Sequence, residues 1–272
     1  MKNKIFIVSD SHFSLFSSKF EIKKQDIFLS FLDKFEKEMN TLILLGDFFD
    51  FWYEWYHVIP KYNFHILYRL RRLKDNGVKV IFIPGNHDFN PGCYLQNSIG
   101  FEYVGDSYTI ESNGIKIFLT HGDGAATNDK GYRFLKKILR SKITNFMFRT
   151  FIPADLGIEI AKYVSKNSRK YRGNITGKIN TGYIDFAKRR FKEGCDCVIL
   201  GHIHKPMDLK IGDNRFINSG DWITYFSYIT IENGTIKLDY FDHQNIDDKL
   251  RSRLLSNLSL NIKKENLCQN QD

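Results

Sequence analysis

Five apolar runs of strand length recur along the chain, and each of them ends in polar residues. They cover residues 4–10, 41–47, 78–88, 115–123 and 196–204. Aliphatic and β-branched side chains in segments of this length are typical of buried strands. Because the carboxyl ends of strands in open α/β sheets carry the ligand sites, we expect these polar residues to meet at one edge of the fold.

Segments with helical periodicity separate the first three runs. Ile27, Phe28 and Phe31 repeat at helical spacing in the first of these segments, and Leu67 and Leu70 do so in the second. Alternation of strand, helix and strand predicts a sheet with crossover connections. The dipeptides 113–114 and 233–234 are both Asn-Gly, which favours tight hairpins and hence some antiparallel strands.

These patterns predict an α/β (α+β) fold, a sandwich of two mixed β-sheets flanked by helices. We expect one domain over residues 1–245 and a polar tail over 246–272. The stretch from about 124 to 192 has no strand pattern and is expected to form a helical insertion, or lid, over the strand ends.

The predicted insertion is strongly basic. Residues 129–192 hold 17 Lys and Arg against 4 Asp and Glu, an excess of +13, whereas the whole chain carries +9 and the remainder therefore sums to −4. Such a surface suits nucleic acid, anionic lipid headgroups or a phosphorylated substrate. No apolar stretch reaches the roughly 18 residues of a membrane span and the N-terminus has no signal-peptide layout, so we expect a cytoplasmic protein.

The polar residues at the strand ends are metal-ligand types. They are Asp10, His12, Asp47, Asn86, His87, His121, His202 and His204. Oxygen and imidazole ligands without thiolates suit Mn, Fe or Zn. So many ligands exceed what one ion takes, which favours two ions that share a carboxylate. A two-metal centre activates water at neutral pH and stabilises the charge of a displacement at phosphorus.

Each fragment also has a structural interpretation. A single Gly-Asp or His-x-His is more often a loop end or a hydrogen-bonded histidine than a metal ligand. Five separate strand ends that all supply metal-type donors are hard to explain in that way.

The ordered set D-x-H, GD, GNHD, H and GHxH, over residues 10–204, resembles the calcineurin-like metallophosphoesterase superfamily. The resemblance implies a metallophosphoesterase-type sandwich. It also implies one ion on Asp10, His12 and His204, a second on Asn86, His121 and His202, and Asp47 as the bridging ligand. His87 would contact the scissile phosphate and protonate the leaving group. Asp88 would orient His87 through a hydrogen bond.

Longer segments, at 46–60, 121–139, 151–170 and 218–230, are similar to the UDP-2,3-diacylglucosamine pyrophosphatases of lipid A biosynthesis. This resemblance covers residues 4 to about 242. It implies hydrolysis of the pyrophosphate bond to UMP and 2,3-diacylglucosamine 1-phosphate, with two divalent ions, most often Mn. Asp129, Tyr132, Ser168 and Arg169 match substrate-pocket positions. The best-known branch has arginine at the position of His87, which weakens the transfer of substrate contacts there.

The insertion and the aromatic residues after Asp50 each leave two interpretations open. Apolar residues from Phe134 to Phe151 would form an acyl-chain slot or simply the core of the insertion. Its cations would meet phosphates and anionic membrane headgroups, in a peripheral contact, or form a solvated face. Trp52, Trp55 and Tyr56 would stack on a base or sugar, or pack in the protein.

Two other functions compete with this one. A nuclease or phosphodiesterase could use the same metal centre, with the basic insertion along a phosphate backbone. The bulky apolar residues among those cations argue against it, and we expect no stable nucleic-acid partner. A non-enzymatic binding scaffold would be expected to have lost ligands, and all seven are present.

Overall fold

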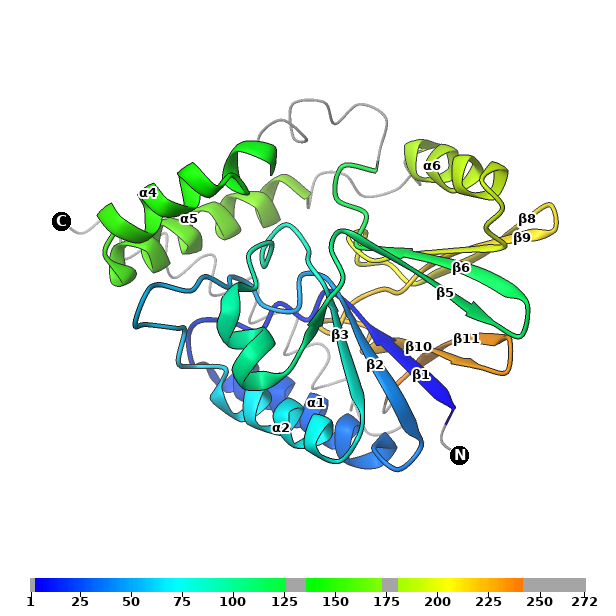
Figure 1. The fold of residues 1–272 in the computed structure, drawn as a ribbon, viewed down its shortest axis with the longest axis horizontal. Coiled ribbons are helices and arrows are strands. Elements are labelled where there is room, and N and C mark those ends of the chain that lie inside the picture. The colour runs from blue at the N-terminus through cyan, green and yellow to red at the C-terminus, as the bar shows by residue number, and fades with distance from the viewer. Residues whose placement is uncertain (1–2, 126–135, 173–180, 242–272) are drawn as a thin grey trace.

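The computed structural model describes residues 3–125, 136–172 and 181–241 (Figure 1). In chain order, its elements are β1 (Lys4–Val8), α1 (Lys19–Phe35), β2 (Met39–Leu45), α2 (Phe64–Asp75), β3 (Lys79–Ile83), the π-helical turn η1 (Tyr94–Ile99), β4 (Glu102–Tyr103), β5 (Ser107–Ser112), β6 (Ile115–Thr120), α4 (Lys142–Phe151), α5 (Ala154–Arg172), α6 (Thr181–Lys192), β7 (Cys197–Leu200), β8 (Met207–Ile211), β9 (Asn214–Asn218), β10 (Ser227–Glu232) and β11 (Thr235–Tyr240).

The strands form two mixed sheets. One has six strands in the order β11-β10-β1-β2-β3-β4, and the other has five in the order β5-β6-β7-β9-β8. Strands β1, β2, β3 and β4 are parallel, and β10 and β11 add an antiparallel edge. In the second sheet β6, β7 and β9 are parallel, with β5 and β8 antiparallel at the edges. The predicted sandwich of two mixed sheets is confirmed.

Both predicted hairpins are present, and each has a two-residue turn. Asn113 and Gly114, with φ of 50° and 77°, join β5 to β6, and Asn233 and Gly234, with φ of 49° and 80°, join β10 to β11. Positive φ at both turn residues is the type I′ geometry, which matches the twist of the flanking strands and which Asn-Gly adopts readily.

The layers are held together by three apolar clusters. Isoleucines such as Ile7, Ile43 and Ile199 fill the space between the sheets. Phe28 and Phe31 on α1 lie in an aromatic cluster on the outer face of the first sheet, together with residues of α2. α6 covers the outer face of the second sheet (Figure 1). α6 therefore belongs to the sandwich, although it falls within the stretch expected to form the insertion.

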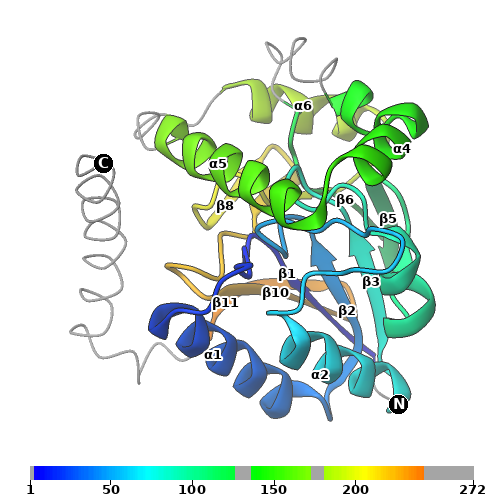
Figure 2. The ribbon, with the colours of Figure 1, turned by 90° about the vertical axis from the view of Figure 1, so that its left-hand side faces the viewer.

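Helices α4 and α5 lie on the carboxyl-terminal side of the strands (Figures 1 and 2). α4 has no buried residue, and its side chains of Ile143, Phe146 and Phe151 are 77%, 56% and 65% exposed. Most apolar residues of α4 are thus exposed, whereas Phe148 is partly buried and packs against Tyr53, with ring centroids 4.9 Å apart; Phe134 and Leu135 lie outside the described residues. Within the described part of the chain, none of the helices combines the length and the apolar character that a membrane crossing requires.

The aromatic cluster under α1 makes a direct stability prediction. Phe31 is fully buried, and its ring centroid lies 4.9 Å from that of Trp222. Phe31→Ala should lower the free energy of unfolding by about 3–5 kcal/mol, because it leaves a cavity among rigid rings. Phe64→Ala, at a side chain that is 61% exposed, should change it by less than about 1 kcal/mol. Equal losses in urea denaturation would contradict this account of the core.

Candidate functional site

The carboxyl ends of the strands bring the candidate ligands together. Asp10 and His12 follow β1, Asp47 follows β2, His121 follows β6, and His202 and His204 follow β7. They form two groups, Asp10 with His12 and His204, and Asp47 with His121 and His202, in each of which the ligand atoms lie within 4.8 Å of one another. A third such group joins His12, Asp47 and His87.

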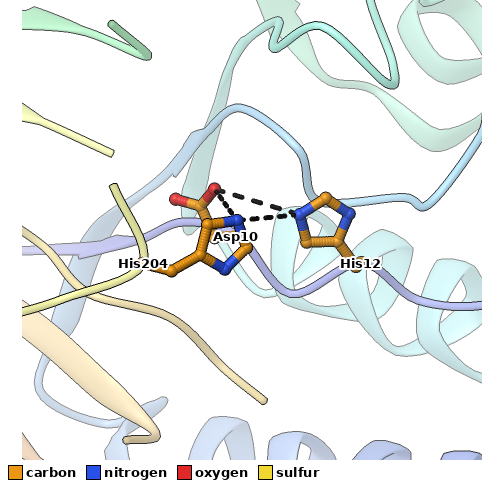
Figure 3. Close-up of side chains that lie close together, drawn as sticks. All are labelled: Asp10, His12 and His204. Carbon is orange, nitrogen blue, oxygen red and sulfur yellow. Dashed lines mark hydrogen bonds and ion pairs between the residues drawn. The ribbon is translucent and has the colours of Figure 1, made fainter. Parts of the chain in front are cut away.

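The first group, called the Asp10 group here, is drawn in Figure 3. Oδ1 of Asp10 lies 3.3 Å from Nε2 of His204 and 4.0 Å from Nε2 of His12, and these two Nε2 atoms are 3.4 Å apart. Among the described residues no donor hydrogen-bonds to this buried oxygen. The other oxygen of Asp10 accepts the backbone N–H of His202, at 2.9 Å. One carboxylate oxygen and two ring nitrogens therefore point at a common place.

The second group, called the Asp47 group, is joined to the first through its carboxylate. Oδ2 of Asp47 lies 3.4 Å from Nε2 of His121 and 3.6 Å from Nε2 of His12. This buried oxygen also accepts no hydrogen bond from the part of the chain that the structure describes. Nδ1 of His202 lies 3.3 Å from Nε2 of His121. Asp47 thus faces ligands of both groups, as a shared ligand must.

The backbone at these ligands is strained. Five of them have positive φ, namely Asp10 (52°), His12 (43°), Asp47 (49°), His202 (67°) and His204 (60°). This region costs non-glycine residues about 1–3 kcal/mol each, and such residues cluster at functional sites. The turns also bring the backbone of one loop close to the next: a Cβ at Gly85 would overlap the Asp47 side chain. Sequence patterns did not predict this strain.

The electrostatics of the site favour a bound cation. Burial alone would raise the pKa of Asp47, but His121 and His87 hold it well below its usual range. Burial lowers the pKa of His12 to about 4, so the ring is neutral, as a metal ligand must be. For His121 burial also lowers the pKa, yet Asp47 and Asp10 raise it to about 10, so that without a cation this ring holds a proton, which a bound metal would displace. Two buried carboxylate oxygens accept no hydrogen bond from the residues that the structure describes, and such a site fits divalent cations.

The GNHD loop after β3 contributes the remaining candidates. Asn86 and His87 are both partly buried there, between the end of β3 and η1. Nε2 of His87 lies 4.0 Å from Oδ2 of Asp47, and its ring meets the His12 ring edge to face at 4.7 Å. Nδ1 of His87 is 2.8 Å from the carbonyl oxygen of Asp50. His87 is therefore in the site, with one nitrogen held by backbone.

Asp88 does not orient His87, and that expectation was wrong. Its carboxylate instead accepts the backbone N–H groups of Gly85, Asp47, Phe48 and Phe49, at 2.7, 3.2, 2.7 and 3.1 Å. The loop after β3 turns back so that this buried side chain points at the loop after β2. Asp88 thus fixes the segment that carries Asp47.

The expected substrate contacts are placed only in part. Asp129 and Tyr132 lie outside the described residues. Ser168 and Arg169 fall within α5, and their side chains are outside the described part.

The aromatic residues after Asp50 mostly pack in the protein. Trp52 is buried and donates to the Pro91 carbonyl, at 3.1 Å. Trp55 donates to the Ile152 carbonyl at 2.9 Å, and so ties this loop to the insertion. Tyr56 is 59% exposed, with Arg149 stacked 5.2 Å from its ring centroid. The packing interpretation holds for both tryptophans.

Comparison with known proteins establishes the family. The model of the calcineurin-like phosphoesterase family matches residues 3–206, which include every strand end described above. The chain belongs to the calcineurin-like phosphoesterase family. It is accordingly a hydrolase, and the scaffold alternative loses its basis.

Curated relatives of this phosphoesterase cover most of the chain. The UDP-2,3-diacylglucosamine hydrolase of Porphyromonas gingivalis is 28% identical over 257 residues, 88% of this chain and 98% of the relative. The protein of the same name from Pseudomonas savastanoi pv. phaseolicola is 28% identical over 248 residues, 88% of this chain and 96% of the relative. Among solved structures, the E. coli phosphoesterase Yfce is 15% identical, with a TM-score of 0.46 over 89% of this chain and 95% of that one.

The hydrogen bonds that the Asp88 carboxylate accepts from backbone, called the Asp88 clamp here, can be tested by their effect on the free energy of unfolding. Asp88→Ala should lower the free energy of unfolding by about 3 kcal/mol or more, because each buried N–H left without an acceptor costs roughly 1–3 kcal/mol. Asp208→Ala, which removes a half-exposed partner of Arg215, should cost less than about 1 kcal/mol. Both are measured by urea denaturation with excess chelator, so that lost metal does not contribute. Equal effects would contradict the clamp.

Proposed function

We propose that this phosphoesterase uses two divalent cations to hydrolyse the pyrophosphate bond of UDP-2,3-diacylglucosamine, giving UMP and 2,3-diacylglucosamine 1-phosphate for lipid A biosynthesis. The observation that carries the reaction type is the pair of ligand groups that share Asp47. The substrate is supported by the names of relatives that align over nearly their whole length. We place this activity in one domain over residues 1–245.

Seven side chains would hold the cations. Asp10, His12 and His204 would bind one ion, Asn86, His121 and His202 the other, and Asp47 both. These ligand types suit Mn, Fe and Zn, and of the three we propose Mn. When bound, such ions activate water and neutralise charge on the phosphoryl oxygens.

The remaining polar residues of the site have roles of their own. The carbonyl of Asp50 can only accept, so Nδ1 of His87 keeps its proton and Nε2 is the nitrogen that exchanges one. Nε2 faces the Asp47 side of the site and would protonate the leaving phosphate. Asp88 would act by holding the Asp47 loop in place. Asp129, Tyr132, Ser168 and Arg169 stay as proposed substrate contacts.

Helices α4 and α5 supply a surface suited to the lipid part of the substrate. Besides the exposed side chains of α4, Leu156, Ile160 and Tyr163 on α5 are 51%, 42% and 69% exposed. The same two helices carry exposed cations, among them Lys142 and Lys162, which neighbour apolar residues in the sequence. Apolar side chains with cations among them suit acyl chains and anionic headgroups, so we propose a peripheral contact with the cytoplasmic face of the inner membrane.

The substrate assignment is tested by release of UMP from UDP-2,3-diacylglucosamine, with Mn and detergent, beside a chelator-treated sample and a generic phosphodiester. Wild type should release UMP only with metal. His121→Ala and Asp47→Asn should each lower the rate by about 10³-fold or more, since metal-ion catalysis supplies several kcal/mol. Their circular dichroism should stay like that of wild type.

Two outcomes would count against this function. Hydrolysis of the generic ester alone would keep the metal centre and overturn the substrate, leaving a phosphodiesterase or nuclease on another nucleotide or nucleic acid. Wild-type rates in Asp47→Asn would overturn the two-metal centre itself.

The proposed membrane contact can be tested with a matched pair of variants. Phe151→Ser on α4 should weaken co-sedimentation with phosphatidylglycerol-containing vesicles about tenfold, because it removes an apolar side chain from the contact. Phe64→Ser changes a side chain of similar exposure, 61% against 65%, at the start of α2 and should have no effect. Equal loss in both variants, or no binding by wild type, would contradict the proposal.

A further inference from the structure

A buried ion pair on α1 lies against the loop that carries Asp10 and His12. Nζ of Lys24 is 2.9 Å from Oε2 of Glu21, and these two side chains are only 3% and 5% exposed. Charged side chains are rarely buried to this extent unless they are paired. Neither residue belongs to the seven proposed metal ligands, so this buried pair calls for another role.

Both members of the pair bind backbone groups of that loop. Nζ of Lys24 donates to the carbonyl oxygens of Ser11 and His12, in each case at 2.8 Å. Oε1 of Glu21 accepts the backbone N–H of Ser14, at 3.1 Å. The ion pair therefore connects α1 to three successive parts of the loop, two through their carbonyl oxygens and one through its N–H.

The other side of the same loop is held by backbone. The N–H groups of His12 and Phe13 donate to the carbonyl oxygens of Asp47 and Phe48, at 2.9 and 3.0 Å. His12 lies between these bonds and those of Lys24, with a strained φ of 43°. Strain of this kind persists only where the surrounding groups over-determine the backbone. At His12 the loop after β2 fixes the N–H, and α1 fixes the carbonyl.

We infer that Lys24, paired with Glu21, is a positioning residue that keeps the His12 ring in the metal site. Without the ammonium group, the His12 carbonyl would lose a donor that opposes relaxation of its positive φ. Relaxation of that angle would turn the ring away from Asp10 and Asp47, which its Nε2 now faces. This inference rests on the proposed two-metal centre and deepens it.

The charge of Lys24 acts in the opposite direction to its position. A positive side chain near a metal site repels the metal ion, so charge alone predicts that removing the ammonium group tightens metal binding. Loss of positioning predicts weaker binding instead. The sign of the change therefore separates the two explanations.

The test is calorimetric titration of chelator-treated protein with Mn²⁺, in the absence of substrate. Lys24→Met should weaken Mn²⁺ binding about tenfold, an effect of the size expected when a partner outside the ligand set is lost. Lys24→Gln removes the same charge but keeps an N–H donor, so its loss should be smaller. Lys23→Met, at the exposed neighbour on the same helix, is the matched control and should bind like wild type.

Thermal unfolding with chelator separates positioning from a purely structural role. Each titration is done at a temperature where the variant is folded. A purely structural role would lower the melting temperature of Lys24→Met and leave its Mn²⁺ affinity unchanged, whereas positioning lowers the affinity of the folded protein. Should Lys24→Met fail to fold, Lys24→Gln decides.

Unchanged or tighter Mn²⁺ binding in the deciding variant would overturn the inference, and so would an equal loss in Lys23→Met. Failure of wild type to bind Mn²⁺ would instead overturn the metal centre and this inference together. Because no substrate is present, the titration is independent of whether UDP-2,3-diacylglucosamine is hydrolysed.

Discussion

The buried carboxylate of Asp47 is the point at which the two halves of the site meet. It comes from the first sheet, at the end of β2, and it faces His121 from the second sheet as well as His12 from its own. Its Oδ1 accepts the backbone N–H of His87 at 2.8 Å, whereas Oδ2 accepts no hydrogen bond from the described residues, and a buried carboxylate oxygen of this kind is stabilised by nearby positive charge. The sandwich therefore brings together groups that favour a cation, and the proposed reaction follows from that charge distribution.

Several features of the surrounding structure keep the Asp47 carboxylate and its strained backbone in this position. Positive φ at Asp47 and at four other ligands is strained, and strain persists only where surrounding structure over-determines it. The Asp88 carboxylate fixes the N–H groups of the Asp47 segment. Beneath it, isoleucine side chains lock the two sheets together, so that strand ends from both sheets keep their separation.

The sequence predicted the sheets, the helices and the gathering of candidate ligands at the strand ends, because each depends on a local signal. Apolar runs, Asn-Gly turns and polar strand ends mark them directly. The role of Asp88 had no such signal, since a buried carboxylate accepts hydrogen bonds from whichever donors the fold brings near it, and the expectation for Asp88 was wrong for that reason. The sequence likewise did not predict that α4 exposes its apolar residues, because the spacing of apolar residues is the same whether their side chains are buried or face outwards.

Anomalous diffraction from crystals of Mn-loaded protein tests the shared role of Asp47 most directly. The account predicts two manganese peaks that flank the Asp47 carboxylate, one in contact with Asp10, His12 and His204 and the other with Asn86, His121 and His202. A single peak, or two peaks that do not share Asp47, would contradict it.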